Sequence, residues 1–316
     1  MTPFFLLKIN LIMKKIVVSL VLLLSISCKK ETETMAPQLQ FKFKFNPDQE
    51  RLNSIGQIAV VPIGHGAYAP EFNSMCVHYI ELIEDEYTAL GKGFIVYKGA
   101  STASTNSIYA DAIDFDKSTV KPSDEVWLSV PLSAIPQKKY KYIRTSVAYQ
   151  NYDVVYNINN IPNVGTLSNQ KGTIASFVGY NTQINNLKVK SISTSVNASK
   201  IQGFWAFETQ LAAPYTAYNK VSTGQAPQGA TTVVNPLAGF NNNVPSGSCV
   251  VTGAIENNLD LTVTNTQNKT ITLSYSTNKS FEWLDTNNNG QWDMTYPNNI
   301  EQVIDMGLRG LKAFVN

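Results

Sequence analysis

Leu39-Gln40-Phe41-Lys42-Phe43-Lys44-Phe45 decides the fold class, because large apolar side chains alternate there with polar ones. Successive side chains of a β-strand point to opposite faces, so this spacing predicts a half-buried strand with its basic face toward water. The same alternation recurs in residues 126–130, 140–148, 174–180, 187–196, 201–209, 250–255, 259–264, 270–276, 281–285 and 301–306. We therefore expect an all-β protein.

Clusters of turn-forming residues separate these runs, among them Pro162-Asn163-Val164-Gly165 and Asn257-Asn258. Such residues tolerate tight or left-handed backbone geometry. No long segment combines helical spacing with caps; residues 78–89 come nearest, but they begin with the β-favouring His78-Tyr79-Ile80. Many short strands with regular turns predict an antiparallel β-sandwich, either one large sandwich or two packed ones.

The polar part of the composition is unusual for a globular protein. Charged residues make up 15% of the chain, and the formal net charge is +2. The usual charged fraction is about a quarter. The low net charge gives no electrostatic reason to expect nucleic-acid binding. Low charge with many amides and hydroxyls suits an extracytoplasmic β protein.

The N-terminus has the layout of a secretory signal. Lys14 and Lys15 precede the apolar run 16–26, and Ser25 and Ser27 supply small side chains before Cys28. A signal peptide needs this order of positive, apolar and small residues, and a membrane span needs a longer apolar run. Residues 1–12 look redundant, so we expect translation to start at Met13.

The segment Leu24-Ser25-Ile26-Ser27-Cys28 resembles the bacterial lipobox, with Ser25 where the family usually has leucine. The resemblance implies that Cys28 is acylated, becomes the mature N-terminus and anchors the protein to a membrane; more than one acyl chain gives stable anchoring. The alternative is an ordinary signal peptide with a chance cysteine. The charged segment 29–34 reads as a disordered tether and weakly resembles the surface-export signals of Bacteroidota lipoproteins.

These features predict the domain layout. Residues 1–27 would be the signal peptide, 28–37 the lipidated tether, and 38–316 the β-sandwich body. A soft division near residue 198 is an alternative to a single body, because the composition after it is richer in Asn, Thr and Gly.

Two cysteines besides Cys28 are present, Cys76 and Cys249. A disulfide between them would persist in an oxidising compartment and would close a long loop. The alternative is two separate buried thiols, because sequence alone does not place the two Cα atoms close together.

The best local motif is Asp285-Thr286-Asn287-Asn288-Asn289-Gly290-Gln291-Trp292-Asp293. It resembles the DxDxDG calcium loops of EF-hands and of many extracellular β proteins, with asparagine at two aspartate positions and Tyr296 where position twelve expects an acid. Ca²⁺ takes about 6–8 oxygen ligands, and the glycine permits the sharp turn. The alternative is a metal-free Asn/Gly turn. The expected calcium ligands are Asp285, Asn287, Asn289, the backbone carbonyl of Gln291, Asp293 and, if residues 294–300 bulge outward, Glu301.

The histidines offer an alternative metal site. Cys76 and His78 would share one strand face, and His65 lies in a Gly-His-Gly loop, so the three would suit copper or zinc. A Cys-x-His pair on a strand is more often part of the packing.

Catalytic motifs are weak. No Gly-x-Ser-x-Gly elbow is present, and the carboxylates that a glycosidase would need, including Glu84-Asp85-Glu86, show no distinctive spacing. The aromatic side chains of residues 149–156 and 203–207 would either bind a sugar ring or pack in the core.

Several stretches together resemble uncharacterised Bacteroidota lipoproteins, and this likeness carries no assigned activity. The stretches are His78-Tyr79-Ile80-Glu81-Leu82, Ala148-Tyr149-Gln150-Asn151-Tyr152-Asp153, Gln202-Gly203-Phe204-Trp205-Ala206-Phe207-Glu208, Ser280-Phe281-Glu282-Trp283 and Asp305-Met306-Gly307-Leu308-Arg309-Gly310.

The sequence thus predicts a non-catalytic binding or accessory lipoprotein on the periplasmic or cell-surface face of an outer membrane, with a glycan or a protein as ligand. The alternatives are a metal-handling lipoprotein and a surface hydrolase.

Overall fold

The computed structural model of the chain describes residues 36–53, 57–103, 111–177, 186–195, 203–225 and 250–316. The chain divides into two compact units, residues 1–35 and 36–316, and only the second contains described residues. The signal peptide, Cys28 and the proposed division near residue 198 lie outside the described residues, so those expectations stay predictions.

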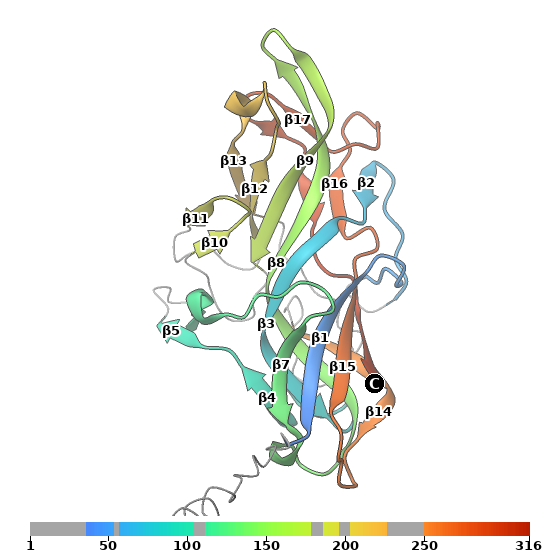
Figure 1. Ribbon diagram of the computed structural model, residues 1–316. Coiled ribbons are helices and arrows are strands. Elements are labelled where there is room, and N and C mark those ends of the chain that lie inside the picture. Colours follow the sequence, from blue (N-terminus) through green and yellow to red (C-terminus); the bar gives the residue numbers. More distant parts are fainter. Residues whose placement is uncertain (1–35, 54–56, 104–110, 178–185, 196–202, 226–249) are drawn as a thin grey trace, which may run out of the picture. The chain divides into compact units, whose positions relative to one another are not determined.

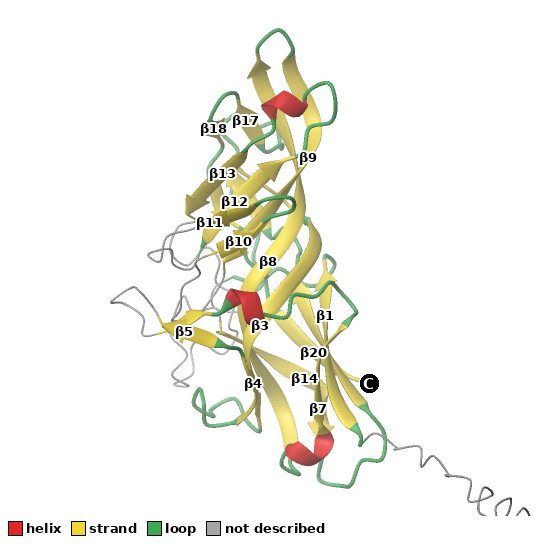
Figure 2. Cartoon of the chain, turned by 60° about the vertical axis from the view of Figure 1, so that its left-hand side comes forward, coloured by secondary structure: helices red, strands yellow, loops and turns green. Residues whose placement is uncertain are grey.

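The described residues are almost entirely β-structure, which confirms the predicted fold class. Figure 2 shows strands throughout and helix only in short 3-10 segments. In chain order the elements are β1 (Gln38–Asn46), β2 (His65–Tyr68), β3 (Glu71–Ile83), β4 (Phe94–Lys98), β5 (Ser101–Ala103), β6 (Asp111–Ile113), η1 (Phe115–Lys117), β7 (Val126–Pro131), η2 (Leu132–Ala134), β8 (Lys139–Ile161), β9 (Gly165–Phe177), β10 (Asn186–Lys188), β11 (Ser193–Ser195), β12 (Phe204–Thr209), η3 (Thr216–Tyr218), β13 (Val221–Gln225), β14 (Val250–Asp260), β15 (Lys269–Ser276), β16 (Phe281–Leu284), β17 (Asp293–Thr295), β18 (Asn299–Ile300), β19 (Val303–Asp305) and β20 (Leu311–Val315).

One large sheet carries most of the strands, in the order β13-β12-β9-β8-β14-β20-β15-β1-β7. A second, three-stranded sheet has the order β19-β16-β2. The arrangement is sandwich-like, as expected, but the large sheet is mixed rather than purely antiparallel. Strands β1 and β15, β14 and β20, and β8 and β17 pair in parallel. Parallel partners come from distant parts of the chain, so local turn signals do not predict them.

Strand β8 is the central strand of the fold, 23 residues long (Figure 1). One edge pairs first with β14 and then with β9; the other pairs with β3 and then with β17. Its residues 143–152 are all buried, because core clusters cover both faces of this part of the sheet. A strand buried on both faces loses the alternation of a half-exposed one. The run of residues 140–148 predicted only the first part of this strand, which continues to Ile161.

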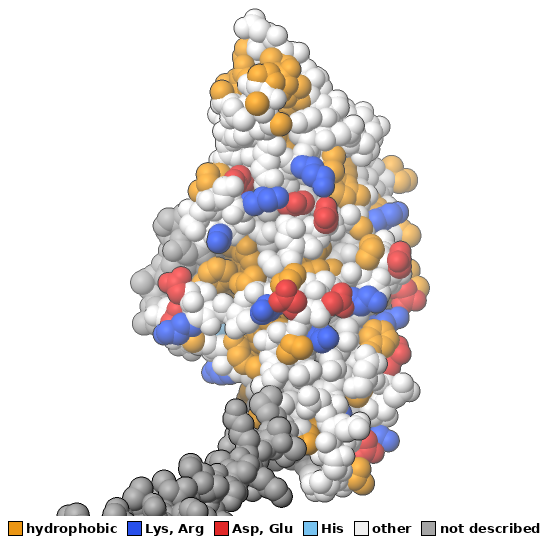
Figure 3. Space-filling view, in the orientation of Figure 1, with side chains coloured by type: hydrophobic (Ala, Val, Ile, Leu, Met, Phe, Trp, Pro, Cys, Tyr) orange, Lys and Arg blue, Asp and Glu red, His pale blue; other side chains and the backbone are white. Residues whose placement is uncertain are grey.

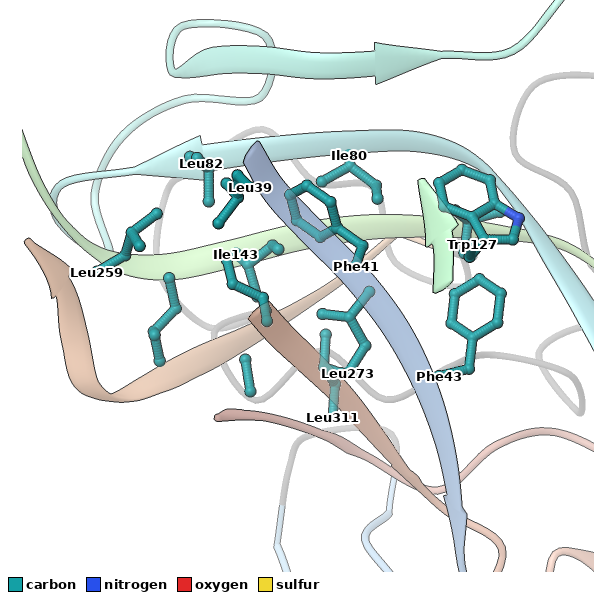
Figure 4. Close-up of a cluster of buried hydrophobic side chains, with 14 of the residues drawn as sticks. Leu39, Phe41, Phe43, Ile80, Leu82, Trp127, Ile143, Leu259, Leu273 and Leu311 are labelled. Carbon is teal, nitrogen blue, oxygen red and sulfur yellow. The ribbon is translucent and has the colours of Figure 1, made fainter. Parts of the chain in front are cut away.

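The first core cluster lies between β1, β7 and β15 on one side and β3 and β8 on the other. Figure 4 shows Phe41 and Phe43 of β1 in the same cluster as Ile80 of β3 and Ile143 of β8. Leu39, Phe41 and Phe43 are fully buried, as the alternation of apolar and polar residues in this strand predicted. Burying one such side chain contributes on the order of 1.5–3 kcal/mol.

The second core cluster is rich in aromatic rings and lies along the C-terminal half of β8. Trp283 of β16, Trp292 and Phe207 of β12 are buried there with Tyr156 of β8. The rings of Phe207 and Trp292 meet edge to face, with centroids 4.9 Å apart. Aromatic pairs in this arrangement stabilise a fold by about 0.5–1.5 kcal/mol beyond their buried area.

Two strand predictions were wrong in part. Within the predicted strand of residues 187–196, the described residues form a short hairpin of β10 and β11 rather than one strand. Residues 261–264 lie outside any strand, because Asp260 ends β14 by accepting hydrogen bonds from the backbone and hydroxyl of Thr262. Asn257 and Asn258, expected as a turn, have positive φ and lie at an irregularity within β14.

Candidate functional site

The turn that links β16 to β17 contains the predicted calcium loop. Asp285 is buried, and its carboxylate accepts hydrogen bonds from the backbone N–H groups of Asn289 (3.1 Å) and Gly290 (2.8 Å). Asn288 and Gly290 have positive φ, which lets the backbone wind around this carboxylate. The sequence thus predicted the local winding of the loop from its first aspartate and its glycine.

Asp293 lies on the inner side of the same turn, where three asparagine side chains surround its carboxylate. Oδ2 accepts from Nδ2 of Asn287 (2.6 Å) and of Asn289 (2.8 Å), and Oδ1 accepts from Nδ2 of Asn157 (2.9 Å). Burial alone would raise the pKa of Asp293, but these hydrogen bonds outweigh it and hold the pKa below its usual range.

Glu301 reaches the turn from the end of the β17–β18 hairpin. Residues 294–300 form this hairpin, with Met294 buried in the second core cluster, rather than an outward bulge. Oε1 of Glu301 accepts from the backbone N–H (2.8 Å) and hydroxyl (2.7 Å) of Thr286, and Oε2 accepts from the N–H of Asp293 (3.0 Å). The Gln291 carbonyl accepts from the Trp283 indole at 3.1 Å. The six predicted residues therefore meet in one turn that is closed by hydrogen bonds.

A metal ion in this turn would need amide and backbone oxygens. Among the described residues, no group of three or more His, Cys, Asp or Glu side chains is arranged to hold a metal ion. The amide nitrogens of Asn287 and Asn289, rather than their oxygens, face Asp293. Calcium binding would require both amides to turn their oxygen atoms to the ion.

The alternative metal set of His65, Cys76 and His78 is not gathered in one place. His65 contacts Glu282 of β16. Cys76 lies in a third core cluster, where it is buried with Tyr149 and Phe177. The pairing of β3 with β8 is irregular on both sides of Val77, so the residues do not follow regular strand spacing there. These bulges interrupt the two-residue repeat of the strand, so Cys76 is fully buried while His78 is half-buried.

Cys76 is a fully buried free thiol in the part of the chain that the structure describes. Burial raises its pKa to about 12, so the thiol stays protonated at neutral pH. Cys249 lies outside the described residues, and the proposed disulfide stays a prediction.

A buried cluster of charged side chains includes Glu282 of β16, the strand that leads into the turn of residues 285–293. The sequence did not predict this cluster. Glu282 of β16 is paired with Arg51 and, at 2.5 Å, with Nδ1 of His65 on β2. Arg309 pairs with Asp305 of β19 and approaches Glu282 at 3.6 Å. No spacing signal could have revealed it, because its members come from four distant segments. Burial raises the pKa of Asp305 to about 6, because it outweighs the lowering of that pKa by the positive charge of Arg309.

The aromatic residues that the sequence offered for sugar binding are in the core. Tyr149, Tyr152, Tyr156, Phe204, Trp205 and Phe207 are each at most 8% exposed. Their role is packing, because both faces of β8 and β12 are covered at these positions.

A different aromatic cluster is partly exposed at the end of the β8–β9 hairpin. We call it the tyrosine surface; it comprises Tyr215, Tyr218 and Tyr296 with the exposed prolines Pro162, Pro214 and Pro297. The rings of Tyr218 and Tyr296 meet edge to face at 5.5 Å, and the Tyr218 hydroxyl donates to the Pro162 carbonyl at 3.4 Å. Figure 3 shows hydrophobic side chains gathered near the top of the view, around η3 and the hairpin. The sequence signal was the uncharged segment 211–219, which contains two tyrosines and one proline.

Comparisons with protein-family models, with curated proteins and with solved structures gave no match. Within the described residues, no helix has the length and apolar character needed to cross a bilayer. A functional conclusion therefore depends on the geometry of this chain alone.

Proposed function

We propose that this protein is a lipid-anchored binding module of an outer membrane that holds a neutral glycan on its tyrosine surface. The order of Lys14-Lys15, the apolar run and Cys28 supports the anchor. The all-β body, with few charged residues, supports an extracytoplasmic binding role rather than a catalytic one.

The tyrosine surface is the observation that carries the ligand class. The three segments that form it, residues 159–166, 211–219 and 296–300, contain tyrosine, proline, asparagine and threonine and no charged residue. A charged group does lie at the edge of this surface, where the Lys220 ammonium donates to the Pro297 carbonyl. Tyrosine offers an apolar face to the C–H groups of a sugar ring and a hydroxyl to its oxygens. A surface with this chemistry suits a neutral glycan better than a charged protein partner.

Binding to a glycan array, followed by calorimetry with the best ligand, tests this assignment. We expect Tyr218→Ala and Tyr296→Ala to weaken binding at least tenfold, which corresponds to about 1.4 kcal/mol. Tyr87→Ala is the matched control, because Tyr87 is 64% exposed and lies between β3 and β4. If no glycan on the array binds, or if all three variants lose the same binding affinity, the glycan proposal is refuted.

The anchor is tested by mass spectrometry of the native N-terminus and by membrane fractionation. We expect a chain that begins at acylated Cys28 and a Cys28→Ser variant that leaves the membrane fraction. An unmodified, uncut N-terminus would refute the anchor. Protease treatment of whole cells then distinguishes the cell-surface face from the periplasmic face.

We further propose that the turn of residues 285–293 takes a weakly bound calcium ion that stiffens it. The loop winds around Asp285 as such loops require, and Asn287 and Asn289 would supply amide oxygens once both amides turn toward the ion. Few negative charges predict a Kd of about 10⁻⁴–10⁻³ M. We expect calcium to raise the melting temperature and Asp285→Ala to abolish the rise; identical melts in calcium and in chelator would contradict this.

Elemental analysis of the purified protein decides between this ion and the metal-handling alternative. Copper or zinc at unit stoichiometry would favour the alternative, although no described geometry supports it. No described arrangement favours the surface hydrolase either, because Arg51 and Arg309 neutralise the adjacent carboxylates Glu282 and Asp305.

A further inference from the structure

A pocket of about 290 Å³ lies between the end of β12, the β10–β11 turn and the start of β13. Its volume is near the lower end of the roughly 300–1,000 Å³ range of small-molecule sites, which suits a single ring. The residues that line it are Ser191, Ile192, Glu208, Thr209, Gln210, Leu211, Asn219 and Lys220.

Glu208 is the buried carboxylate among the residues that line this pocket. The residue is 7% exposed, and its Oε2 accepts hydrogen bonds from the backbone N–H groups of Lys190 (3.2 Å), Ser191 (3.0 Å) and Ile192 (3.3 Å). Its Oε1 accepts no hydrogen bond from any described residue. A carboxylate oxygen accepts up to two hydrogen bonds, so Oε1 gives this wall of the pocket an acceptor whose carboxylate is fixed through Oε2.

The other residues that line the pocket favour a ligand without charge. Ser191, Thr209, Gln210 and Asn219 are neutral, and the Lys220 ammonium is held away by the carbonyl of Pro297. The Glu208 carboxylate disfavours an anion, while three N–H groups already stabilise its charge and reduce the gain from a cation. A neutral ligand with hydroxyl donors fits best. Ile192, 48% exposed, and Leu211 supply apolar contact for a ring.

The frame around the pocket is rigid enough to preorganise it. The Asn219 side chain bridges the backbone of Leu211, accepting from its N–H (2.6 Å) and donating to its carbonyl (3.0 Å). This clamp closes the neck of the segment 211–219, whose outer part carries Tyr215 and Tyr218. The pocket and the tyrosine surface are thus built on one loop.

We propose that this pocket binds one neutral pyranose unit, with a sugar hydroxyl donating to Glu208 Oε1, as the specificity subsite of the glycan surface. The proposal rests on the proposed glycan-binding function and gives it a selective element: the tyrosine rings would hold any sugar face, whereas Glu208 requires a hydroxyl at a fixed place.

A panel of neutral monosaccharides, titrated at millimolar concentration into the full mature chain and followed by ligand-observed NMR, tests the pocket separately from the tyrosine surface. We expect at least one hexose or pentose to bind, and Glu208→Gln to weaken it at least tenfold. The glutamine oxygen would take the place of Oε2 at the three N–H groups and present an amide donor to the sugar. Ile192→Trp, at an exposed wall position, should block the pocket without disturbing the core.

Tyr218→Ala and Tyr296→Ala should leave monosaccharide binding unchanged while they weaken longer glycans. If longer glycans bind through the tyrosines but no monosaccharide binds, or if Glu208→Gln and Ile192→Trp bind it as the wild type does, the pocket assignment is overturned while the proposed function stands. If monosaccharides bind with the expected dependence on Glu208 but tyrosine variants bind longer glycans normally, the pocket stands and the tyrosine surface falls.

Discussion

Asn157 and Asp293, 136 residues apart in the chain, are joined by a hydrogen bond of 2.9 Å from Nδ2 to Oδ1. The backbone N–H of Asn157 also donates to the Trp292 carbonyl at 2.9 Å. Asn157 lies on β8 and Asp293 begins β17, so this contact fastens the candidate calcium turn to the central strand. The position of the turn is therefore set by β8 as well as by its own sequence.

Replacing Asn157 with alanine should destabilise the protein, because Asp293 would lose one of the amide donors that keep it ionised. We expect a loss of about 1–3 kcal/mol in the free energy of unfolding, measured by urea denaturation. Ser168→Ala, an exposed substitution on the neighbouring strand β9, should stay near zero. Equal stability of the two variants would show that the contact contributes nothing.

Gly66 of β2 lies directly against the indole ring of Trp283, and an added Cβ would overlap that ring. Gly66→Ala should therefore cost about 1–3 kcal/mol through overpacking of the second core cluster. Thermal unfolding followed by near-ultraviolet circular dichroism would report both the lower melting temperature and the disturbed tryptophans. The double variant Gly66→Ala/Trp283→Phe should recover part of the loss, and an alanine variant as stable as the wild type would contradict the close approach.

Glu282 holds the buried charged cluster together, since it contacts Arg51, His65 and Arg309. Glu282→Gln would leave buried guanidinium groups without a counter-charge, and we expect a loss of about 3–5 kcal/mol in chemical denaturation. Glu125→Gln is the control: Glu125 pairs with Lys121 on the surface, where such pairs contribute about 0–1 kcal/mol. Similar effects at both positions would mean that the cluster is not stabilising.

Asp305 should give the protein a pH dependence of unusual sign. Its pKa rises from 3.8 to about 6 on folding, because burial outweighs the attraction of Arg309. The folded protein then keeps a proton that the unfolded chain has released. The stabilising contribution is fully present below about pH 4 and is lost as the pH rises through about 6, on the order of 3 kcal/mol in all.

Denaturation of the wild type and of Asp305→Asn between pH 4 and 7 measures this contribution, since only the wild type should show the fall. Asp153→Asn provides the opposite comparison. Burial alone would raise the pKa of Asp153, but hydrogen bonds from Thr173 and Asn73 and the charge of Lys190 lower it below 3.8. Its contribution should therefore stay constant between pH 4 and 7 and be lost only at lower pH, so Asp153→Asn should follow the slope of the wild type in this range. Parallel stability curves for the wild type and Asp305→Asn would refute the assignment.

Much of the local structure could be predicted from alternation and turn chemistry. Phe41 and Phe43 are buried as their spacing required, and the Asp285 turn winds as its aspartate and glycine required. The full length of β8 was not predicted, because its second half is set by pairing with β9 and β17, and β17 comes from a distant part of the chain. The exposure of aromatic residues was also beyond sequence: Trp205 and Tyr156 are core, whereas Tyr218 and Tyr296 are partly exposed.

By itself, the sequence determined that this chain forms β-strands, where many of them start and stop, and how the turn of residues 285–293 is wound. These properties depend on the period of side chains along a strand and on backbone preferences within a few residues. Only the tertiary structure decided that Glu208 lines a pocket, that Glu282 contacts His65 although the two lie 217 positions apart in the chain, and that three tyrosines share one surface. Strand pairing between distant segments creates those neighbours, and no local pattern encodes it.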